Sequence, residues 1–242
     1  MLQAMVAAAE RVFEFLEQPE EIETTKGEID TSKIKGNVEF KHVNFGYDED
    51  KTIINDFSAN IKEGQKIAIV GPTGAGKTTM VKLLMRFYDV NSGEINIDGH
   101  NIKDFKRGEL RKMFGMVLQD TWLFGGTVKE NIKYGNEEAT DGEVIEAAKA
   151  AHVHHFIKTL PKGYNSILNE ESSNVSAGQK QLLTIARVIL ANPKILILDE
   201  ATSSIDTRTE IQIQKAMDNL MKGRTSFIIA HRLSTIKNAD LI

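Results

Sequence analysis

The sequence KIAIV at residues 66–70, followed directly by GPTGAGKTT at residues 71–79, decides the fold of this 242-residue chain. The first stretch is apolar enough for a strand that is buried on both faces of a parallel sheet. The second matches the phosphate-loop pattern, in which a lysine and a hydroxyl residue follow the last glycine. A helical run from Thr79 to Phe87 comes next, so the loop amides and the helix N-terminus are expected to converge on one anion.

Each residue type in this loop has a physical role in binding a triphosphate. The glycines let the backbone wrap around the phosphates, Lys77 supplies a point charge to the β- and γ-phosphates, and the Thr78 hydroxyl is a candidate magnesium ligand. The alternative is a glycine-rich turn with a surface lysine, which does not account for strand, loop and helix occurring together. The candidate nucleotide-binding residues of the loop are Gly71, Pro72, Thr73, Gly74, Ala75, Gly76, Lys77, Thr78 and Thr79.

A second apolar strand, ILIL at residues 195–198, ends in the two carboxylates Asp199 and Glu200. The carboxyl ends of parallel strands face the ligand crevice, so Asp199 is expected to coordinate magnesium and Glu200 to interact with a water molecule. An acidic pair that caps a helix is the alternative that this motif alone leaves open. The nearby phosphate loop favours the catalytic interpretation.

Composition and charge restrict the class of protein. Apolar residues make up 41% of the chain and charged residues 26%, which is typical of a folded globular chain. The formal charge of -4 comes from intermixed acids and bases, so a nucleic acid is a weak candidate partner. The absence of cysteine favours a reducing compartment. No apolar run approaches the roughly 20 residues that cross a bilayer, so any link to a membrane is expected through another segment or subunit.

The pattern along the chain predicts a helix, a linker and a layered body. Residues 1–17 carry apolar side chains at helical spacing before Pro19, and the acidic segment after it is interpreted as a linker. The chain therefore divides into a helix with linker at 1–27 and a nucleotide-binding domain at 28–242.

Two kinds of sheet and a helical insert are predicted within this domain. Polar and apolar residues alternate at 38–45 and 53–61, which indicates strands of a partly exposed antiparallel sheet. Helical patterns with Thr127 or Asp141 as a cap predict a helical subdomain at about 120–190. The predicted fold is α/β, a P-loop NTPase core with a parallel sheet, an N-terminal antiparallel β subdomain and a helical insert.

A series of short segments accompanies these motifs in a characteristic order. The first contains an aromatic residue and precedes the phosphate loop. Gln119 and His231 are polar residues that each follow an apolar strand, and the other two segments lie before and after the strand that ends in Asp199. The segments are Phe45-Gly46-Tyr47, Gln119, Asn174-Val175-Ser176-Ala177-Gly178-Gln179, Ser203-Ser204-Ile205-Asp206 and His231. Together the motifs resemble the ATP-binding cassette (ABC) family over nearly the whole of residues 38–242.

The resemblance implies roles for three of these residues at the nucleotide. Tyr47 matches the family's aromatic residue that stacks on adenine, although a tyrosine packed on the sheet is the alternative for this residue alone. Gln119 matches the Q-loop glutamine, which would link magnesium to the membrane-domain contact, and His231 matches the switch histidine, which would fix the γ-phosphate and the attacking water. The implied catalytic residues are Glu200, His231, Gln119 and Lys77, and the implied magnesium ligands are Thr78, Gln119 and Asp199.

The segment at 174–179 resembles the family's signature and implies a dimer. It begins a helix whose N-terminus is a second anion site, and one chain has no need for two sites at the γ-phosphate. The resemblance implies a head-to-tail pair, which places Ser176, Gly178, Gln179 and the D-loop Asp206 at the cofactor. An ordinary serine cap is the alternative for the signature serine alone. Ala177 stands where the family has a glycine, so we hypothesise a heterodimer with one weakened site.

Three features resemble the exporter subclass. The helix at 7–13 is similar to the tail that follows the last membrane helix, the aromatic residues after Gln119 are similar to a coupling-helix contact, and Glu170 is similar to the X-loop glutamate. The implied protein lies at the cytoplasmic face of the cell membrane. Its implied partners are ATP and Mg2+, a second nucleotide-binding domain, and a transmembrane domain of the same polypeptide. Because Asp240-Leu241-Ile242 only begins a strand, the chain is interpreted as a piece of a longer polypeptide, truncated at both ends.

Other functions stay open at this point. A non-transport ABC-type ATPase would share the nucleotide site, but its usual coiled-coil inserts or tandem cassettes are not found in the sequence. A phosphate-loop kinase has no use for the signature segment or His231, and a nucleotide-gated regulatory subunit has no need of Glu200. The expected function is ATP hydrolysis coupled to export of drugs, lipids or peptides.

Overall fold

The computed structural model describes residues 2–18, 29–48, 50–118, 121–169, 174–199, 205–230 and 233–242. Its helices are α1 (Leu2–Leu16), α2 (Lys77–Leu84), α3 (Arg107–Lys112), α4 (Val128–Lys133), α5 (Asp141–Ala150), α6 (His154–Thr159), α7 (Ala177–Ala191), α8 (Thr207–Met221) and α9 (Leu233–Lys237). Its strands are β1 (Val38–Phe45), β2 (Ile54–Ile61), β3 (Lys66–Ile69), β4 (Ser92–Ile97), β5 (His100–Asn101), β6 (Phe114–Val117), β7 (Gly126–Thr127), β8 (Ile167–Leu168), β9 (Ile195–Asp199) and β10 (Thr225–Ile229). Short 3-10 helices lie at Thr31–Lys33, Ile102–Asp104 and Gly163–Asn165.

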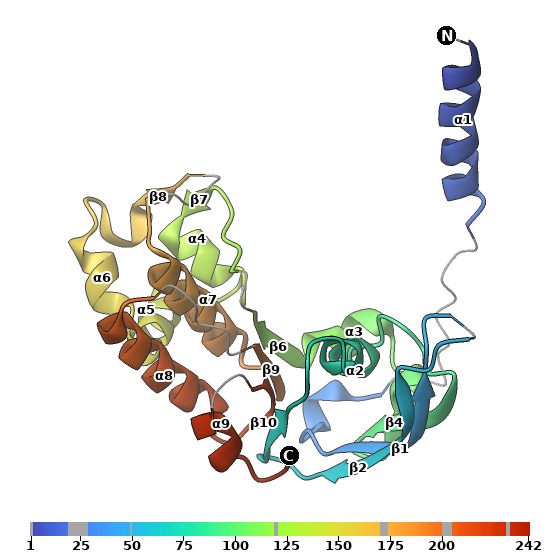
Figure 1. The fold of residues 1–242 in the computed structure, drawn as a ribbon. Helices are drawn as coiled ribbons and strands as arrows, with labels where there is room; N and C mark the ends of the chain where they lie inside the picture. The colour runs from blue at the N-terminus through green and yellow to red at the C-terminus, as the bar shows by residue number, and fades with distance from the viewer. Residues whose placement is uncertain are drawn as a thin grey trace.

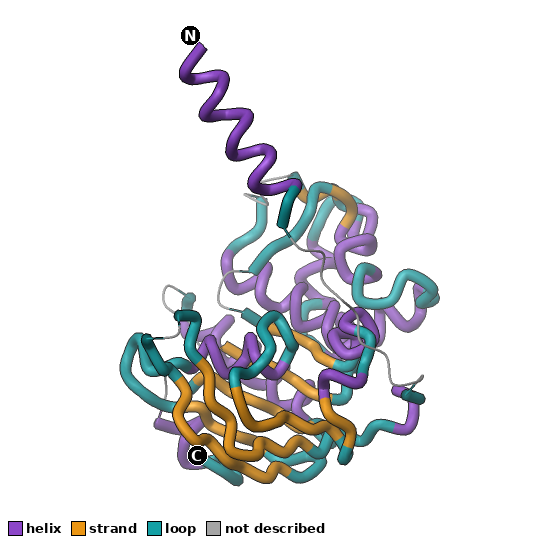
Figure 2. The backbone as a smooth tube through the Cα atoms, turned by 90° about the vertical axis from the view of Figure 1, so that its right-hand side faces the viewer, coloured by secondary structure: helices purple, strands orange, loops and turns teal. Residues whose placement is uncertain are grey.

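Two lobes meet at a central parallel sheet. Figure 1 shows α4 to α8 in one lobe and α2, α3 and the antiparallel sheet in the other, with β6, β9 and β10 between them. Seen from the side in Figure 2, most strands gather at one end of the body and most helices at the other, while the short β7 and β8 lie in the lobe of α4 to α6 (Figure 1). The predicted α/β fold with an antiparallel sheet and a helical part is confirmed.

The antiparallel sheet has the strand order β2-β1-β4-β5. Its central strand β1 pairs Val38 with Ile61 on one side and with Ile97 on the other. Val38 and Phe40 are buried, and after an irregularity in the register between Phe40 and Val43 the buried residues are Val43 and Phe45. On each side of this irregularity the alternation is that of a sheet with one face against the core.

The parallel sheet has the order β3-β10-β9-β6. Along β9, the side chains of Ile195 and Ile197 belong to the core shared with α2, α3 and the antiparallel sheet. Leu196 and Leu198 face the opposite way and join the core of the helical lobe. All four side chains are fully buried, so the strand lies between two cores, as its uninterrupted apolar sequence predicts.

Two helix boundaries differ from the sequence prediction. The helix after the phosphate loop ends at Leu84 rather than Phe87, because Arg86 adopts a left-handed φ of 53° that ends the helical hydrogen bonding. The cap of α5 is Thr140 rather than Asp141, because the Thr140 hydroxyl accepts from the Glu143 amide in a capping box. The other proposed cap, Thr127, does begin α4.

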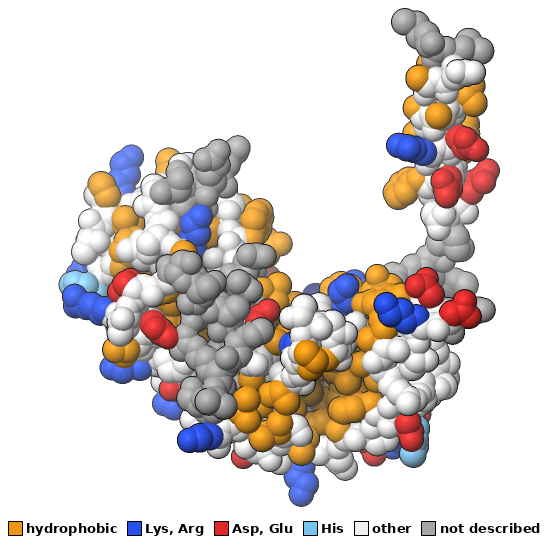
Figure 3. Space-filling model, in the orientation of Figure 1, with side chains coloured by type: hydrophobic (Ala, Val, Ile, Leu, Met, Phe, Trp, Pro, Cys, Tyr) orange, Lys and Arg blue, Asp and Glu red, His pale blue; other side chains and the backbone are white. Residues whose placement is uncertain are grey.

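The N-terminal helix α1 keeps its apolar side chains in solvent. Met5, Val12, Phe13 and Leu16 are each more than half exposed, and Figure 3 shows hydrophobic side chains on the outside of this helix. The segment proposed as a linker, 20–27, lies outside the described residues. In the part of the chain that the structure describes, no helix combines the length and apolar character needed to cross a bilayer.

Candidate nucleotide-binding site

The segment between β3 and α2 is a tight loop that requires glycine. Gly76 has a φ of 86°, and a Cβ there would lie 3.0 Å from side-chain carbons of both Ile53 and Ile54. A Cβ on Gly71 would lie 3.0 Å from the Cβ of Ala75. Both glycines also have a positive φ, 151° at Gly71 and 86° at Gly76, which residues with a side chain rarely adopt. Glycine at these two positions therefore suits the narrow turn that the phosphate-loop pattern predicts.

Lys77 folds back over this loop at the start of α2. Its ammonium donates to the carbonyl oxygen of Gly71 at 2.7 Å and to that of Pro72 at 3.0 Å. The N-cap of α2 is Gly76, so no side chain occupies the amides of the first turn. Free helix amides and a nearby ammonium create a positive cradle, which suits an anion such as a phosphate.

Strand ends bring Asp199 to the same edge of the sheet as the loop. Asp199 pairs in register with Ile229 of β10, and Ile229 pairs with Ile69 at the end of β3. The carboxyl ends of these parallel strands therefore form one edge, from which the phosphate loop also starts. Gln119, Glu200 and His231 lie outside the described residues, so only the strands that precede them, β6, β9 and β10, are placed.

Tyr47 lies against the helix that follows the loop. Its hydroxyl is 3.3 Å from the hydroxyl of Thr79, whose side chain is buried in the first turn of α2. The Tyr47 ring remains 44% exposed. Lys82 and Tyr88 lie next to Tyr47 but were not predicted as site residues. The only signal for them in the sequence is the aromatic pair Phe87-Tyr88 directly after the predicted helix.

The signature residues form a second group at the N-termini of α7 and α8. Ser176 caps α7, with its hydroxyl accepting from the Gln179 amide at 3.3 Å and its own amide donating to Gln179 Oε1 at 2.9 Å. Asp206 caps α8 through the Thr209 amide at 3.0 Å, and this hydrogen bond lowers the pKa of Asp206. Both helices therefore begin with a side chain that satisfies a backbone amide of the first turn.

Gly178 explains why these two helices start side by side. A Cβ on Gly178 would lie 2.3 Å from Cγ2 of Thr209, so α8 approaches α7 where only a hydrogen atom fits. The required glycine thus has a packing role within the chain. Both helices lie in the helical lobe and α2 lies in the other lobe, so a single chain does not bring the signature group onto its own phosphate loop (Figure 1).

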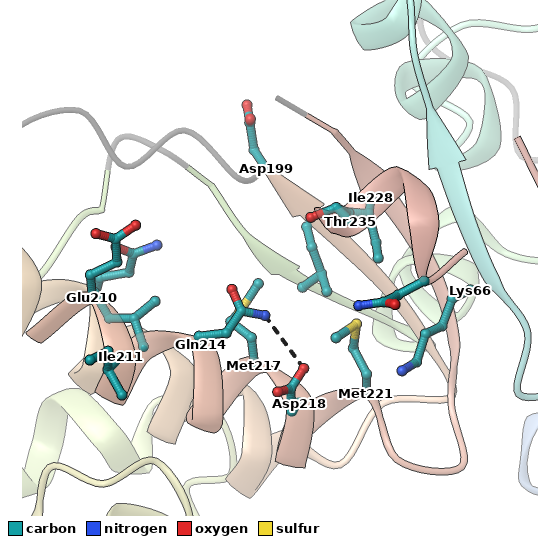
Figure 4. Close-up of a pocket in the computed structure, with 14 residues that line it drawn as sticks. Lys66, Asp199, Glu210, Ile211, Gln214, Met217, Asp218, Met221, Ile228 and Thr235 are labelled. Atoms are coloured by element: carbon teal, nitrogen blue, oxygen red, sulfur yellow. Dashed lines mark hydrogen bonds between the residues drawn. The ribbon is translucent and has the colours of Figure 1, made fainter. Parts of the chain in front are cut away.

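A cavity of about 410 Å³ lies below the strand ends, between α8 and the sheet. Figure 4 shows Asp199 at its rim, with the carboxylate directed away from the hydrogen-bonded side chains of Gln214 and Asp218. Its inner wall includes Ile213 and Met217, and no residue of the phosphate loop lines it. The loop, rather than this cavity, is therefore the candidate nucleotide site.

The strand β3 ends at Ile69, and Val70, predicted to be buried with it, is 43% exposed. A parallel strand, a glycine-constrained loop and an uncapped helix together define a phosphate-loop nucleotide-binding domain. Residues 54–203 match the family model described as ABC transporter. The chain therefore belongs to the ABC transporter family, as an ATP-binding domain.

Relatives agree with this assignment. A fatty acid ABC transporter ATP-binding/permease protein of Mycobacterium tuberculosis is 56% identical over 100% of this chain and 38% of the relative. An ATP-dependent lipid A-core flippase of Syntrophus aciditrophicus is 45% identical over 100% of this chain and 40% of its own length. A bacterial Atm1-family ABC exporter, solved with ATP bound, is 40% identical with a TM-score of 0.81, covering 99% of this chain and 42% of that one. This chain thus spans about two fifths of the length of its relatives.

Proposed function

We propose that this domain binds ATP with Mg2+, pairs with a second nucleotide-binding domain, and couples dimerisation and hydrolysis to export of a substrate across the membrane. The observation that carries the proposal is the loop at 71–76, where Lys77 and the uncapped amides of α2 make a cradle for a triphosphate. Tyr47 would stack on adenine, and its partial exposure beside the same helix supports this role.

The oxygen ligands at the site suit Mg2+. Thr78 presents an exposed hydroxyl in the first turn of α2, and Asp199 ends a strand at the same sheet edge. Hydroxyl and carboxylate oxygens are the donors that this ion prefers, with phosphate oxygens and water completing its shell. Bound there, Mg2+ would neutralise charge on the β- and γ-phosphates.

The remaining catalytic roles follow the order of the strands. Glu200 would act as the general base for water, His231 would fix the γ-phosphate and Gln119 would complete the metal shell. Glu200 directly follows β9, whereas His231 and Gln119 each come two residues after the ends of β10 and β6. These three strands are adjacent in the sheet and end at the edge where the phosphate loop begins.

The separate position of the signature group supports a dimer. Ser176, Gln179 and Asp206 lie at helix N-termini in the lobe opposite α2, so they are available to a partner's nucleotide. Ala177 is exposed at the first position of α7, and its extra methyl would weaken that contact in a heterodimer with one strong site. Full activity of the purified protein as a homodimer would contradict the heterodimer.

Exposed aromatic residues support contact with a transmembrane domain. Trp122 is 63% exposed and Tyr134 60% exposed, on either side of Phe124.

Relatives are named ATP-binding/permease proteins, so we propose that residues 1–27 link the domain at 28–242 to a permease domain of the same polypeptide. The domain would then lie at the cytoplasmic face of the membrane. The named fatty acid and lipid A-core relatives favour an amphipathic, lipid-like substrate here.

Replacement of the proposed base tests the hydrolytic mechanism. Glu200→Gln should lower ATP turnover by about 10²–10⁴ while ATP still binds and holds the dimer together. Glu146→Gln is the matched control, because Glu146 lies on the exposed surface of α5 and should leave turnover unchanged. Hydrolysis by Glu200→Gln at the wild-type rate would exclude this residue as the base.

A further inference from the structure

Tyr47 belongs to a cluster of aromatic rings on the surface beside α2. Its ring meets the edge of Tyr88 with centroids 5.0 Å apart at 81°, and it meets buried Phe45 at 5.1 Å and 83°. The ammonium of Lys82 lies 5.6 Å from the Tyr47 centroid and 5.9 Å from that of Tyr88. Edge-to-face geometry and a nearby cation are both favourable contacts for an aromatic ring.

The backbone around Tyr47 is held by the same segment that carries Tyr88. Gly46 donates its amide to the side-chain oxygen of Asn91 at 2.7 Å. Asn91 in turn donates its amide to the carbonyl of Asn44 at 3.0 Å. Residues 88–91 therefore fix both the turn that presents Tyr47 and the plane of its ring.

This arrangement matters because Tyr47 lies beyond the end of β1, where no strand partner orients it. A ring that must be immobilised when a ligand binds loses rotational freedom, and that loss weakens binding. A ring already held by a neighbour avoids the loss. The contacts of Tyr47 thus bear directly on the strength of base stacking.

We propose that Tyr88 is a positioning residue for the nucleotide base, which acts by holding the Tyr47 ring in the orientation that stacks on adenine. The inference rests on the proposed adenine contact of Tyr47. Tyr88 lies just past the end of α2, the helix that begins at the phosphate cradle, so one short element sets both the triphosphate contacts and the orientation of the ring. Tyr88 is 43% exposed, which allows its replacement without opening the core.

The test compares two ligands on the 242-residue chain by titration calorimetry, a non-hydrolysable ATP analogue and inorganic triphosphate, both with Mg2+. Tyr47→Ala should lower the affinity for the ATP analogue about tenfold, and Tyr88→Ala should lower it about threefold. Neither change should alter the affinity for triphosphate, which has no base. Tyr88→Phe keeps the aromatic ring, so this variant should bind the ATP analogue as tightly as wild type does. Phe87→Ala is the matched control, because Phe87 is also exposed but contacts Arg111 rather than Tyr47.

The double variant separates positioning from direct contact. If Tyr88 acts through Tyr47, the double variant that carries both alanine substitutions will have the same affinity for the ATP analogue as Tyr47→Ala alone. Additive losses, an equal loss for triphosphate, or no loss in Tyr88→Ala would overturn the proposal for Tyr88 while leaving the Tyr47 contact intact. No loss in Tyr47→Ala would overturn the adenine contact itself, and the role of Tyr88 with it.

Discussion

The guanidinium of Arg187 donates to both oxygens of Asn131, from Nε to the main-chain oxygen at 2.8 Å and from Nη2 to Oδ1 at 3.1 Å. A third bond joins it to the carbonyl of Trp122 at 3.1 Å. Asn131 is fully buried, and its side chain also bonds the backbone amide and carbonyl of Phe124. One arginine on α7 therefore fixes α4 and the segment that carries the exposed aromatic residues.

Replacing Arg187 by leucine should lower the free energy of unfolding by about 2 kcal/mol. The two oxygens of Asn131 would lose their hydrogen bonds to the charged guanidinium. Because Asn131 is buried, water does not readily replace these donors. Urea denaturation of the two proteins measures the difference. Lys215→Ala on the exposed face of α8 is the control, with a change below about 0.5 kcal/mol. If Arg187→Leu lowers the free energy of unfolding no more than the control does, the hydrogen bonds of Arg187 contribute little to stability.

Gly178→Ala should destabilise the domain by about 1–3 kcal/mol, because the added methyl overlaps Thr209 at 2.3 Å and also approaches Ile205 at 3.2 Å. Gly142→Ala is a matched control at the same position of a similarly capped helix. A Cβ there meets only the Thr140 hydroxyl, at 3.8 Å, so the change should be neutral or stabilising by about 0.5 kcal/mol. Thermal unfolding that ranks the two variants in the opposite order would contradict the close packing of α7 and α8.

Asp98 gives the domain a specific acid sensitivity. Its carboxylate accepts the amides of Lys35 at 2.6 Å, Gly36 at 3.0 Å and Asn37 at 3.2 Å. Partial burial raises the pKa of Asp98, but these hydrogen bonds outweigh it, and the resulting pKa lies below the ordinary value of 3.8. A depressed pKa in the folded state means that the contribution of Asp98 to stability is present above the unfolded pKa and is lost as pH falls through the folded one.

Asp98→Asn should therefore cost about 1 kcal/mol at pH 7, a value reduced by the partial exposure of the group. The difference from wild type should shrink as the pH falls from about 4 towards the lowered pKa of Asp98 in the folded state, because the carboxyl group is protonated first in the unfolded chain. Below that folded-state pKa both side chains are neutral. Urea unfolding of the two proteins across this range measures it. A difference that stays constant from pH 7 to pH 3 would mean that the charge of Asp98 has no part in holding residues 35–37.

Elements with a strong local pattern could be predicted from the sequence. The strand ending in Asp199 and the helix after Ser176 were found because an uninterrupted apolar run and a capped apolar stripe are local signals. The end of α2 was wrong because Arg86 adopts a left-handed conformation, stabilised by bonds from its side chain to the carbonyls of Lys103 and Phe105. Those partners are distant in sequence and leave no local signal.

The same reason explains what was missed around the candidate site. The sequence marks Tyr47 by its resemblance to a family motif, but the contact with Tyr88 depends on how the segment after α2 returns to β1. Likewise, Gly178 is recognisable as a signature residue, whereas its packing against Thr209 requires the positions of two helices. Motifs thus predict which residues form the candidate site, and tertiary contacts determine how those residues are held.

The most direct measurement is the Mg2+-dependent affinity of the 242-residue chain for ATP, compared with that of Lys77→Ala. We expect wild type to bind ATP and Lys77→Ala to bind it about 10- to 100-fold more weakly, because a charged donor to the phosphates is lost. Lys112→Ala, which removes an exposed lysine paired with Glu109 on α3, should bind as wild type does. Equal affinities for all three proteins, or no binding by wild type, would contradict the central claim that residues 71–79 hold the triphosphate.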